Sequence, residues 1–119
     1  MIKGIDHVQI AGPPGCEAKM REFYGGLLGM IEVEKPELLK PRGGAWFECG
    51  TGSLHIGIEQ DFVPAKKAHP AFRVADVGAL YETLTASGRS CSWDEMIPGV
   101  RRFYVHDPVG NRLEFLQEV

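Results

Sequence analysis

The 119-residue chain has little cysteine, and none of it is arranged to bind zinc or to build a disulfide scaffold. Its three cysteines, Cys16, Cys49 and Cys91, are odd in number and far apart, with no CxxC pair. They are therefore interpreted as small core or near-surface residues. The first ten residues (MIKGIDHVQI) lack the features of a signal peptide, so a cytoplasmic protein is expected.

The chain also lacks an excess of positive charge and a long hydrophobic run. Its 13 Lys and Arg against 16 Asp and Glu give a net charge of −3, which argues against a nucleic-acid partner. No apolar stretch approaches the roughly 20 residues that a membrane helix needs, so no membrane partner is expected. With 44% apolar residues and no blocks of like charge, the sequence is typical of a small globular domain.

The hydrophobic periodicity predicts the same order of elements twice, strand–helix–strand–strand–strand. In the first half, strands are expected over residues 5–10, 30–34, 45–49 and 53–59, with a helix whose apolar face carries Met20, Phe23, Tyr24, Leu27 and Leu28. In the second half, strands are expected over 70–74, 90–93, 101–106 and 112–117, with a helix capped by Asp76 and ended by Gly88. Segments 35–44 and 94–99 are expected to be loops. The sequence thus predicts one domain made of a module over residues 1–60, a linker over 61–68 and a second module over 69–119.

Histidine and glutamate side chains occupy equivalent places in the two halves. His7 lies in the first strand of the first half and His69 opens the first strand of the second, while His55 and Glu114 lie in the last strands. Because strand side chains alternate between faces, each candidate points away from the bulkier apolar residues of its strand. Imidazole and carboxylate ligands suit Zn, Ni, Fe, Co or Mn. A single strand histidine is more often a surface or satisfied core residue than a ligand, but the joint placement of these residues favours a divalent-metal site.

Further polar residues share faces with these candidates and are weaker substrate-binding candidates. They are Gln9, Arg73, Arg102 and Tyr104. The arginines could bind an oxyanion, and the alternative is that they are solvated or salt-bridged surface residues. Either face of the 45–49 strand could point inward, and Trp46 is interpreted as a core or dimer contact rather than a substrate platform.

Three segments resemble the vicinal oxygen chelate superfamily, which includes glyoxalase I, fosfomycin-resistance thiol transferases, bleomycin-resistance proteins and extradiol dioxygenases. They are IDHV at residues 5–8, FYGGLLG at 23–29 and FYVHDPVGNRLE at 103–114, and the pattern HxAxxV at 69–74 supports them. The resemblance covers nearly the whole chain. It implies an α+β fold in which two βαβββ modules form a U-shaped, barrel-like mixed sheet around a divalent metal.

Carried over residue by residue, the resemblance places metal ligands at His7, His69 and Glu114. Glyoxalase I has a carboxylate where this chain has His55, and fosfomycin-resistance enzymes have a non-ligand aromatic residue there. His55 is therefore either a fourth ligand or a residue that lines the pocket. Gln9 stands where fosfomycin-resistance enzymes carry a catalytic threonine, which counts against that activity.

The function implied by the resemblance is a glyoxalase-like metalloenzyme. A divalent metal would chelate adjacent oxygens of a small-molecule substrate in lyase or isomerase chemistry, with Glu114 or a metal-bound water transferring the proton. The alternatives are a metal-free small-molecule binding or resistance protein of the bleomycin-resistance type and an extradiol-type dioxygenase. A homodimer is expected, because small half-sheets leave strand edges that a partner can cover.

Overall fold

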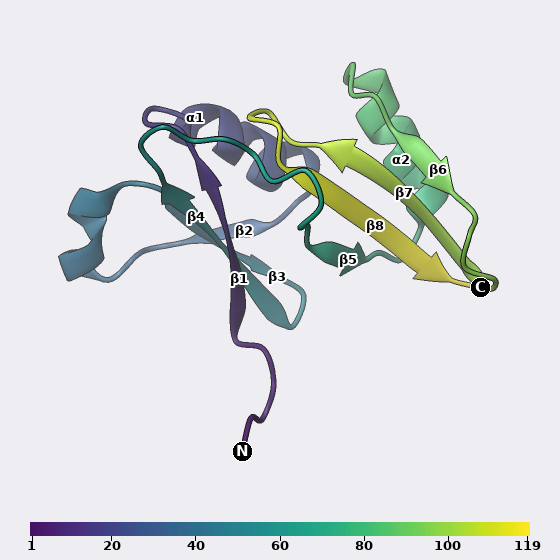
Figure 1. The fold of residues 1–119 in the computed structure, drawn as a ribbon, viewed down its shortest axis with the longest axis horizontal. Coiled ribbons are helices and arrows are strands. Elements are labelled where there is room, and N and C mark those ends of the chain that lie inside the picture. The colour runs from purple at the N-terminus through teal and green to yellow at the C-terminus, as the bar shows by residue number, and fades with distance from the viewer. The chain divides into compact units, whose positions relative to one another are not determined.

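A computed structural model describes all residues 1–119, which divide into two compact units, Met1–Pro64 and Ala65–Val119. Each unit contains one four-stranded mixed sheet together with helical segments (Figure 1). The predicted α+β class is therefore confirmed. None of the helices combines the length and the apolar character needed to cross a bilayer.

The first unit has its sheet in the order β1-β4-β3-β2. Its elements are β1 (His7–Gly12), α1 (Glu17–Met20), η1 (Arg21–Leu27), β2 (Ile31–Val33), η2 (Glu37–Arg42), β3 (Ala45–Cys49) and β4 (Gly52–Ile58). Strand β1 runs parallel to β4, and the other neighbouring pairs are antiparallel. The first and last strands of the unit are thus side by side.

The second unit repeats this topology with the sheet order β5-β8-β7-β6. Its elements are β5 (Ala71–Arg73), α2 (Val77–Ala86), β6 (Ser92–Asp94), β7 (Val100–His106) and β8 (Arg112–Glu118). Strand β5 is parallel to β8, and the remaining pairs are antiparallel. The predicted order strand–helix–strand–strand–strand is confirmed in both units.

In each unit the helices cover one face of the sheet with apolar side chains. The buried residues of the first unit include Phe23 and Tyr24 from the helical segment and Phe47 from the sheet, with the Tyr24 and Phe47 ring centroids 6.0 Å apart. In the second unit, Tyr81 of α2 packs edge-on against the buried Phe103 at 5.5 Å. The polar candidates His55 and Glu114 point to the opposite faces. Along their strands they alternate with buried apolar residues, which are Leu54 and Ile56 on β4 and Leu113 and Phe115 on β8.

The first helix differs from the continuous α-helix that the sequence predicts. Four residues are α-helical, and Arg21–Leu27 then form a π-helix, in which the Leu28 amide donates to the Phe23 carbonyl at 3.0 Å. This i to i−5 bond widens the last turn, which contains Gly25 and Gly26, and the helix ends at Leu27. Phe23 and Tyr24 still point into the core, so the predicted buried face is retained.

Several predicted boundaries are shifted by local hydrogen bonding. Segment 35–44 is not only a loop, because η2 forms with the Leu39 amide donating to the Pro36 carbonyl at 2.9 Å. Strand β1 continues to Gly12, whose carbonyl accepts from the Glu59 amide at 2.9 Å. Asp94 belongs to β6, in register with Arg102, rather than to the loop that follows.

Gly44 provides a test of how closely β3 must approach β4. Its φ is +84°, and a Cβ there would lie 2.0 Å from the Ile56 carbonyl oxygen. We expect Gly44→Ala to lower the free energy of unfolding by at least about 3 kcal/mol, because relief of the clash separates paired strands. Urea unfolding followed by circular dichroism measures this. Gly26→Ala is the matched control, since a Cβ at Gly26 meets no atom within 4 Å, and it should be neutral or stabilising. Equal effects of the two substitutions would contradict the close approach.

Candidate metal centre

The first unit presents a stack of three rings on the face of its sheet opposite the buried Phe23 and Tyr24 of η1. The His55 ring lies 4.1 Å from the His7 ring and 3.8 Å from the Trp46 ring, the latter at an interplanar angle of 2°. Strand register places Gln9 and Trp46 opposite His55 on the same face, and His7, two residues before Gln9, shares that face by alternation. The structure thus resolves the orientation of Trp46, which the sequence leaves open. His55 is buried in this stack, whereas His7 is exposed.

The hydrogen bonding of the stack leaves imidazole nitrogens available as ligands. The Nδ1 atom of His7 lies 2.9 Å from the Asp6 carboxylate, which fixes the proton on Nδ1 and leaves the Nε2 lone pair free. Burial lowers the pKa of His55, and the nearby charges of His7 and Lys35 lower it further against the opposing effect of Asp6. His55 is consequently neutral at pH 7, the form that binds metal ions.

The second unit brings together His69 and Glu114. The Nε2 atom of His69 lies 2.9 Å from Oε1 of Glu114, and Nδ1 lies 2.8 Å from the Lys67 carbonyl oxygen. Because a carbonyl only accepts, Nδ1 carries a proton and points Nε2 at the carboxylate. Contact between Nε2 and Oε1 then needs a second, shared proton. His69 lies two residues before β5 rather than opening it, and the Pro70 carbonyl ties this segment to the Glu114 amide at 3.1 Å.

This pair has the spacing of two neighbouring ligands of one metal ion. Ligand atoms about 2.1 Å from a divalent ion and at right angles to each other are about 3 Å apart, close to the observed separation. A metal ion can therefore take the place of the shared proton. No group of three or more His, Cys, Asp and Glu side chains able to hold a metal occurs in the structure. Each unit instead supplies a pair of the predicted ligands, His7 with His55 and His69 with Glu114.

Arg102 holds the second oxygen of Glu114. Its guanidinium lies 3.3 Å from Oε2 of Glu114 and 3.1 Å from the Asp94 carboxylate, and it donates to the Tyr104 hydroxyl at 2.8 Å. Burial alone would raise the pKa of Glu114, but the hydrogen bonds and charges of His69 and Arg102 lower it overall. Glu114 is therefore a carboxylate at neutral pH.

The four weaker candidates are placed differently. Arg102 and Tyr104 are beside Glu114, and Gln9 is in register with His55. Arg73 points away into solvent, where its side chain is 80% exposed and pairs with Glu118 at 2.7 Å. Arg102 already has two carboxylate partners, so its geometry is that of a positioning residue for Glu114. The substrate-binding roles of these residues stay predictions.

A tight turn sets the register that brings Tyr104 opposite Glu114. The buried Asp107 carboxylate accepts from the amides of Val109 at 3.0 Å and Asn111 at 2.9 Å. Gly110 has a φ of +97°, a conformation that glycine adopts without strain. The motif that the sequence singles out before the last strand therefore serves to position Glu114.

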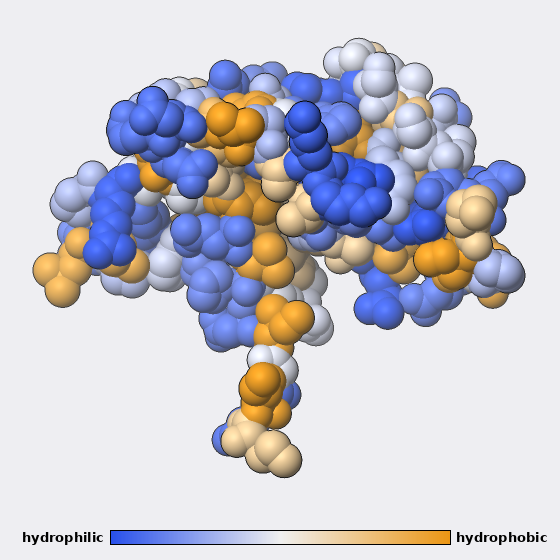
Figure 2. Space-filling model, in the orientation of Figure 1, coloured by the Kyte–Doolittle hydropathy of each residue, from blue (hydrophilic) through white to orange (hydrophobic).

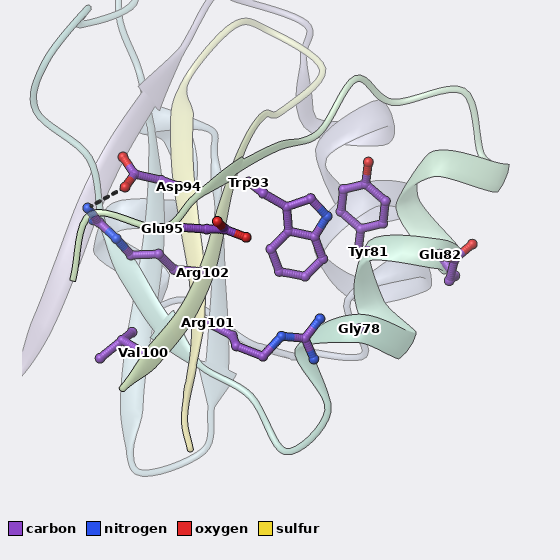
Figure 3. A pocket seen from close by; sticks show the side chains of 9 residues that line it. All are labelled: Gly78, Tyr81, Glu82, Trp93, Asp94, Glu95, Val100, Arg101 and Arg102. Atoms are coloured by element: carbon purple, nitrogen blue, oxygen red, sulfur yellow. Dashed lines mark ion pairs between the residues drawn. The ribbon is translucent and has the colours of Figure 1, made fainter. Parts of the chain in front are cut away.

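Two cavities lie within single units. One, of about 340 Å³, is at the β6 edge of the second unit, where the Trp93 indole lies beside the Tyr81 ring and Arg101 lies over Trp93 (Figure 3). Carboxylates of Glu82 and Glu95 also line it, so both signs of charge meet there. The other, of about 270 Å³, lies against the face of the first sheet that carries His55, with Trp46 in its wall.

Three residues of the site were not identified from the sequence. They are Asp6, which is hydrogen-bonded to His7, and Lys35 and Arg42, which line the cavity beside Trp46. The adjacency of Asp6 to His7 is a signal that the sequence contains. The positions of Lys35 and Arg42 follow from the path of segment 35–44, which has no periodicity to read.

The fold and the candidate site together define the class of protein. It consists of two βαβββ modules, each of which carries a pair of residues of the kinds that bind divalent metals on one face of a mixed sheet. A family profile matches residues 4–115 of the chain. The chain belongs to the Glyoxalase/Bleomycin resistance protein/Dioxygenase superfamily.

Solved structures agree with this assignment. A glyoxalase family protein from Bacillus anthracis is 52% identical, with a TM-score of 0.97, over 100% of this chain and 98% of that one. Lactoylglutathione lyase from Agrobacterium tumefaciens is 19% identical, with a TM-score of 0.77 over 98% and 94% of the two chains. The fosfomycin resistance protein FosX from Listeria monocytogenes is 17% identical, with a TM-score of 0.81 over 100% and 96%. The last two show the shared fold alone. No curated protein matches the sequence.

The two arginine–glutamate pairs of the second unit should differ greatly in their contribution to stability. Arg102→Met leaves the Glu114 carboxylate, 9% exposed, and the Asp94 carboxylate without their cation, and we expect it to cost about 3 kcal/mol or more of unfolding free energy. Arg73→Met removes a pair exposed to solvent on both sides, and we expect a change below about 0.5 kcal/mol. Urea unfolding of both variants measures the contrast. Similar losses would show that Arg102 does not compensate the Glu114 carboxylate.

Proposed function

We propose that the protein is a glyoxalase-like metalloenzyme whose divalent-metal ligands are His7, His55, His69 and Glu114, contributed by modules of one chain or of the two chains of a dimer. The observation that carries the proposal is the 2.9 Å approach of His69 Nε2 to Glu114 Oε1, which is a ligand spacing. The free lone pair on His7 and the neutral state of His55 support the other half of the set. When bound, Zn, Ni, Fe, Co or Mn would supply Lewis acidity toward adjacent oxygens of a small-molecule substrate.

Glu114 is the acid–base of this proposal, in chemistry of the lyase or isomerase type. Its lowered pKa makes it a carboxylate at neutral pH, and Oε1, the proposed metal-binding oxygen beside His69, would have to leave the metal in order to accept a substrate proton. Arg102 binds the other oxygen and holds the carboxylate in one orientation. Burial excludes most water from the carboxylate, so a proton taken from the substrate can be returned to it.

A second candidate is a metal-free small-molecule binding or resistance protein. The stack of Trp46, His55 and His7 favours it, because a flat ligand can be held by aromatic contact beside such a stack. Two imidazoles and a carboxylate would also serve an extradiol-type dioxygenase with Fe or Mn. Chelation separates the binding protein from both enzymes, since only the enzymes lose function when the metal is removed.

We further propose that the protein acts as a homodimer in the cytoplasm. Strands β1, β2, β5 and β6 are sheet edges. The N-terminal segment presents the exposed apolar residues Met1, Ile2 and Ile5 (Figure 2), which a second copy would cover. The three free cysteines suit a reducing compartment. Sedimentation of the purified chain tests the dimer.

Metal binding is tested directly on tag-free protein that is stripped with chelator and reconstituted with each candidate ion. We expect elemental analysis to give about one divalent ion per protein chain. In calorimetric titration, His69→Ala and Glu114→Gln should each weaken affinity at least tenfold, because each removes a ligand. His55→Ala should do the same if His55 is a ligand and have little effect if it only lines the pocket. His106→Ala is the matched control, since His106 is exposed and outside both pairs. Protein that retains no ion after reconstitution would overturn the proposal.

A further inference from the structure

The cavity of the first unit adjoins the proposed metal ligands. Its floor is the sheet face that carries Gln9, Trp46 and Gly57, and Trp46 is stacked directly on His55. Gly57 has no side chain, and the Gln9 amide occupies the space above it, since a Cβ on Gly57 would lie 2.6 Å from the Gln9 Nε2 atom. The Gln9 amide is thereby held over Gly57 on the cavity floor. Gln9 is the register partner of His55, so this amide lies next to the ring stack.

The side wall of this cavity comes from segment 35–44 and carries one sign of charge. Lys35 and Arg42 line the cavity together with the apolar Leu39, and no carboxylate lines it. This contrasts with the net charge of −3 of the whole chain. Local excess of positive charge in a pocket of an acidic protein selects an anionic ligand.

Both cations are able to bind a ligand. Lys35 is half-buried and donates one of its N–H groups to the Gly43 carbonyl, which holds its ammonium over the cavity and leaves further donors. Arg42 is exposed and forms no ion pair in the structure, so its guanidinium fork is free. Lys40, on the same segment, differs because it is paired with Glu34 and Glu37 and does not line the cavity.

The remaining walls define the rest of the ligand. Trp46 offers a flat aromatic surface and Leu39 an apolar one, while the Gln9 amide offers a donor and an acceptor. A volume of about 270 Å³ is at the small end of ligand pockets, which suits a metabolite-sized molecule rather than a peptide or a nucleotide chain.

We propose that the substrate is a small organic acid whose carboxylate is bound by Lys35 and Arg42, whose unsaturated or aromatic body lies on Trp46, and whose oxygens reach the ligands beside His55. The assignment of this ligand as substrate rests on the proposed function. The anion-binding cavity itself rests only on the first unit and needs no metal.

The experiment uses benzoate as a probe that does not chelate strongly, on chelator-treated protein at constant ionic strength. Trp93→Phe leaves Trp46 as the only tryptophan, so its fluorescence reports binding in the cavity. We expect benzoate to quench Trp46 saturably, and the neutral isostere benzamide to bind at least tenfold more weakly. Arg42→Met should weaken benzoate binding at least fivefold, and Lys35→Met likewise, with partial rescue in Lys35→Arg because that variant keeps the charge.

Lys40→Met is the matched control, because it removes a cation of the same segment that does not line the cavity, and it should leave the affinity unchanged. Equal binding of benzoate and benzamide, or equal effects of Arg42→Met and Lys40→Met, would overturn the inference. A second arm with metal-loaded protein compares 3,4-dihydroxybenzoate with benzoate. The dihydroxy acid should bind at least tenfold more tightly, because its two adjacent hydroxyls can chelate the metal while its carboxylate stays at Lys35 and Arg42.

The arms with chelated and with metal-loaded protein distinguish a failure of the proposed metal function from a failure of the proposed substrate class. Loss of the metal-dependent preference for 3,4-dihydroxybenzoate, with benzoate binding intact in the chelated protein, would overturn the metal function and leave the anion cavity standing. Metal binding without charge-selective benzoate binding would overturn the assignment of the substrate class alone.

Discussion

The parallel pairing of the first and last strands in each module is the constraint on which the candidate site depends. Residues in register across these pairs point to the same face, which puts Gln9 beside His55 and Ala71 beside Glu114. A parallel pair needs a long crossover, and the helix in that crossover covers one face of the sheet. The other face is left to polar side chains. A slip of one residue would turn His55 into the apolar core and expose the core residues of the same strand. Burial of the core residues therefore fixes the register.

The two halves of the candidate site follow the same topology but have different electrostatics. The first sheet offers uncharged or weakly charged rings in a stack, with His55 kept neutral by burial. The second sheet buries charge, with Arg102 between the carboxylates of Glu114 and Asp94. One guanidinium against two carboxylates leaves an excess negative charge, which a bound cation would compensate. Arg102 thus keeps Glu114 ionised and in place without cancelling its attraction for a cation.

The sequence was sufficient for the parts that depend on periodicity and turn chemistry. Alternation placed His7, His55 and Glu114 opposite the core, and the Asp76 cap is confirmed by its bond from the Ala79 amide at 3.0 Å. What alternation cannot supply is register between strands, which is why the face of Trp46 stayed open until its pairing with His55 was known. The π-helix was also out of reach, since its apolar spacing over Met20, Phe23 and Tyr24 reads as an ordinary α-helix. Ion pairing of Arg102 and Arg73 depends on neighbours distant in sequence, Glu114 and Glu118, so their different burial could not be read from the strand pattern.

The repeat accounts for the different locations of the proposed metal ligands and of the two cations that line the cavity of the first unit. Equivalent strand positions recur in both modules, and the proposed ligands occupy them. The connections between the second and third strands do not recur. In the first module this connection contains η2 and carries Lys35 and Arg42, while in the second it is the short segment 95–99 between β6 and β7. A loop outside the repeat can change its charge and length without disturbing strand register, because its residues are not part of the paired core. Chemistry shared by the family can therefore stay on the sheets while the choice of substrate changes in the connection.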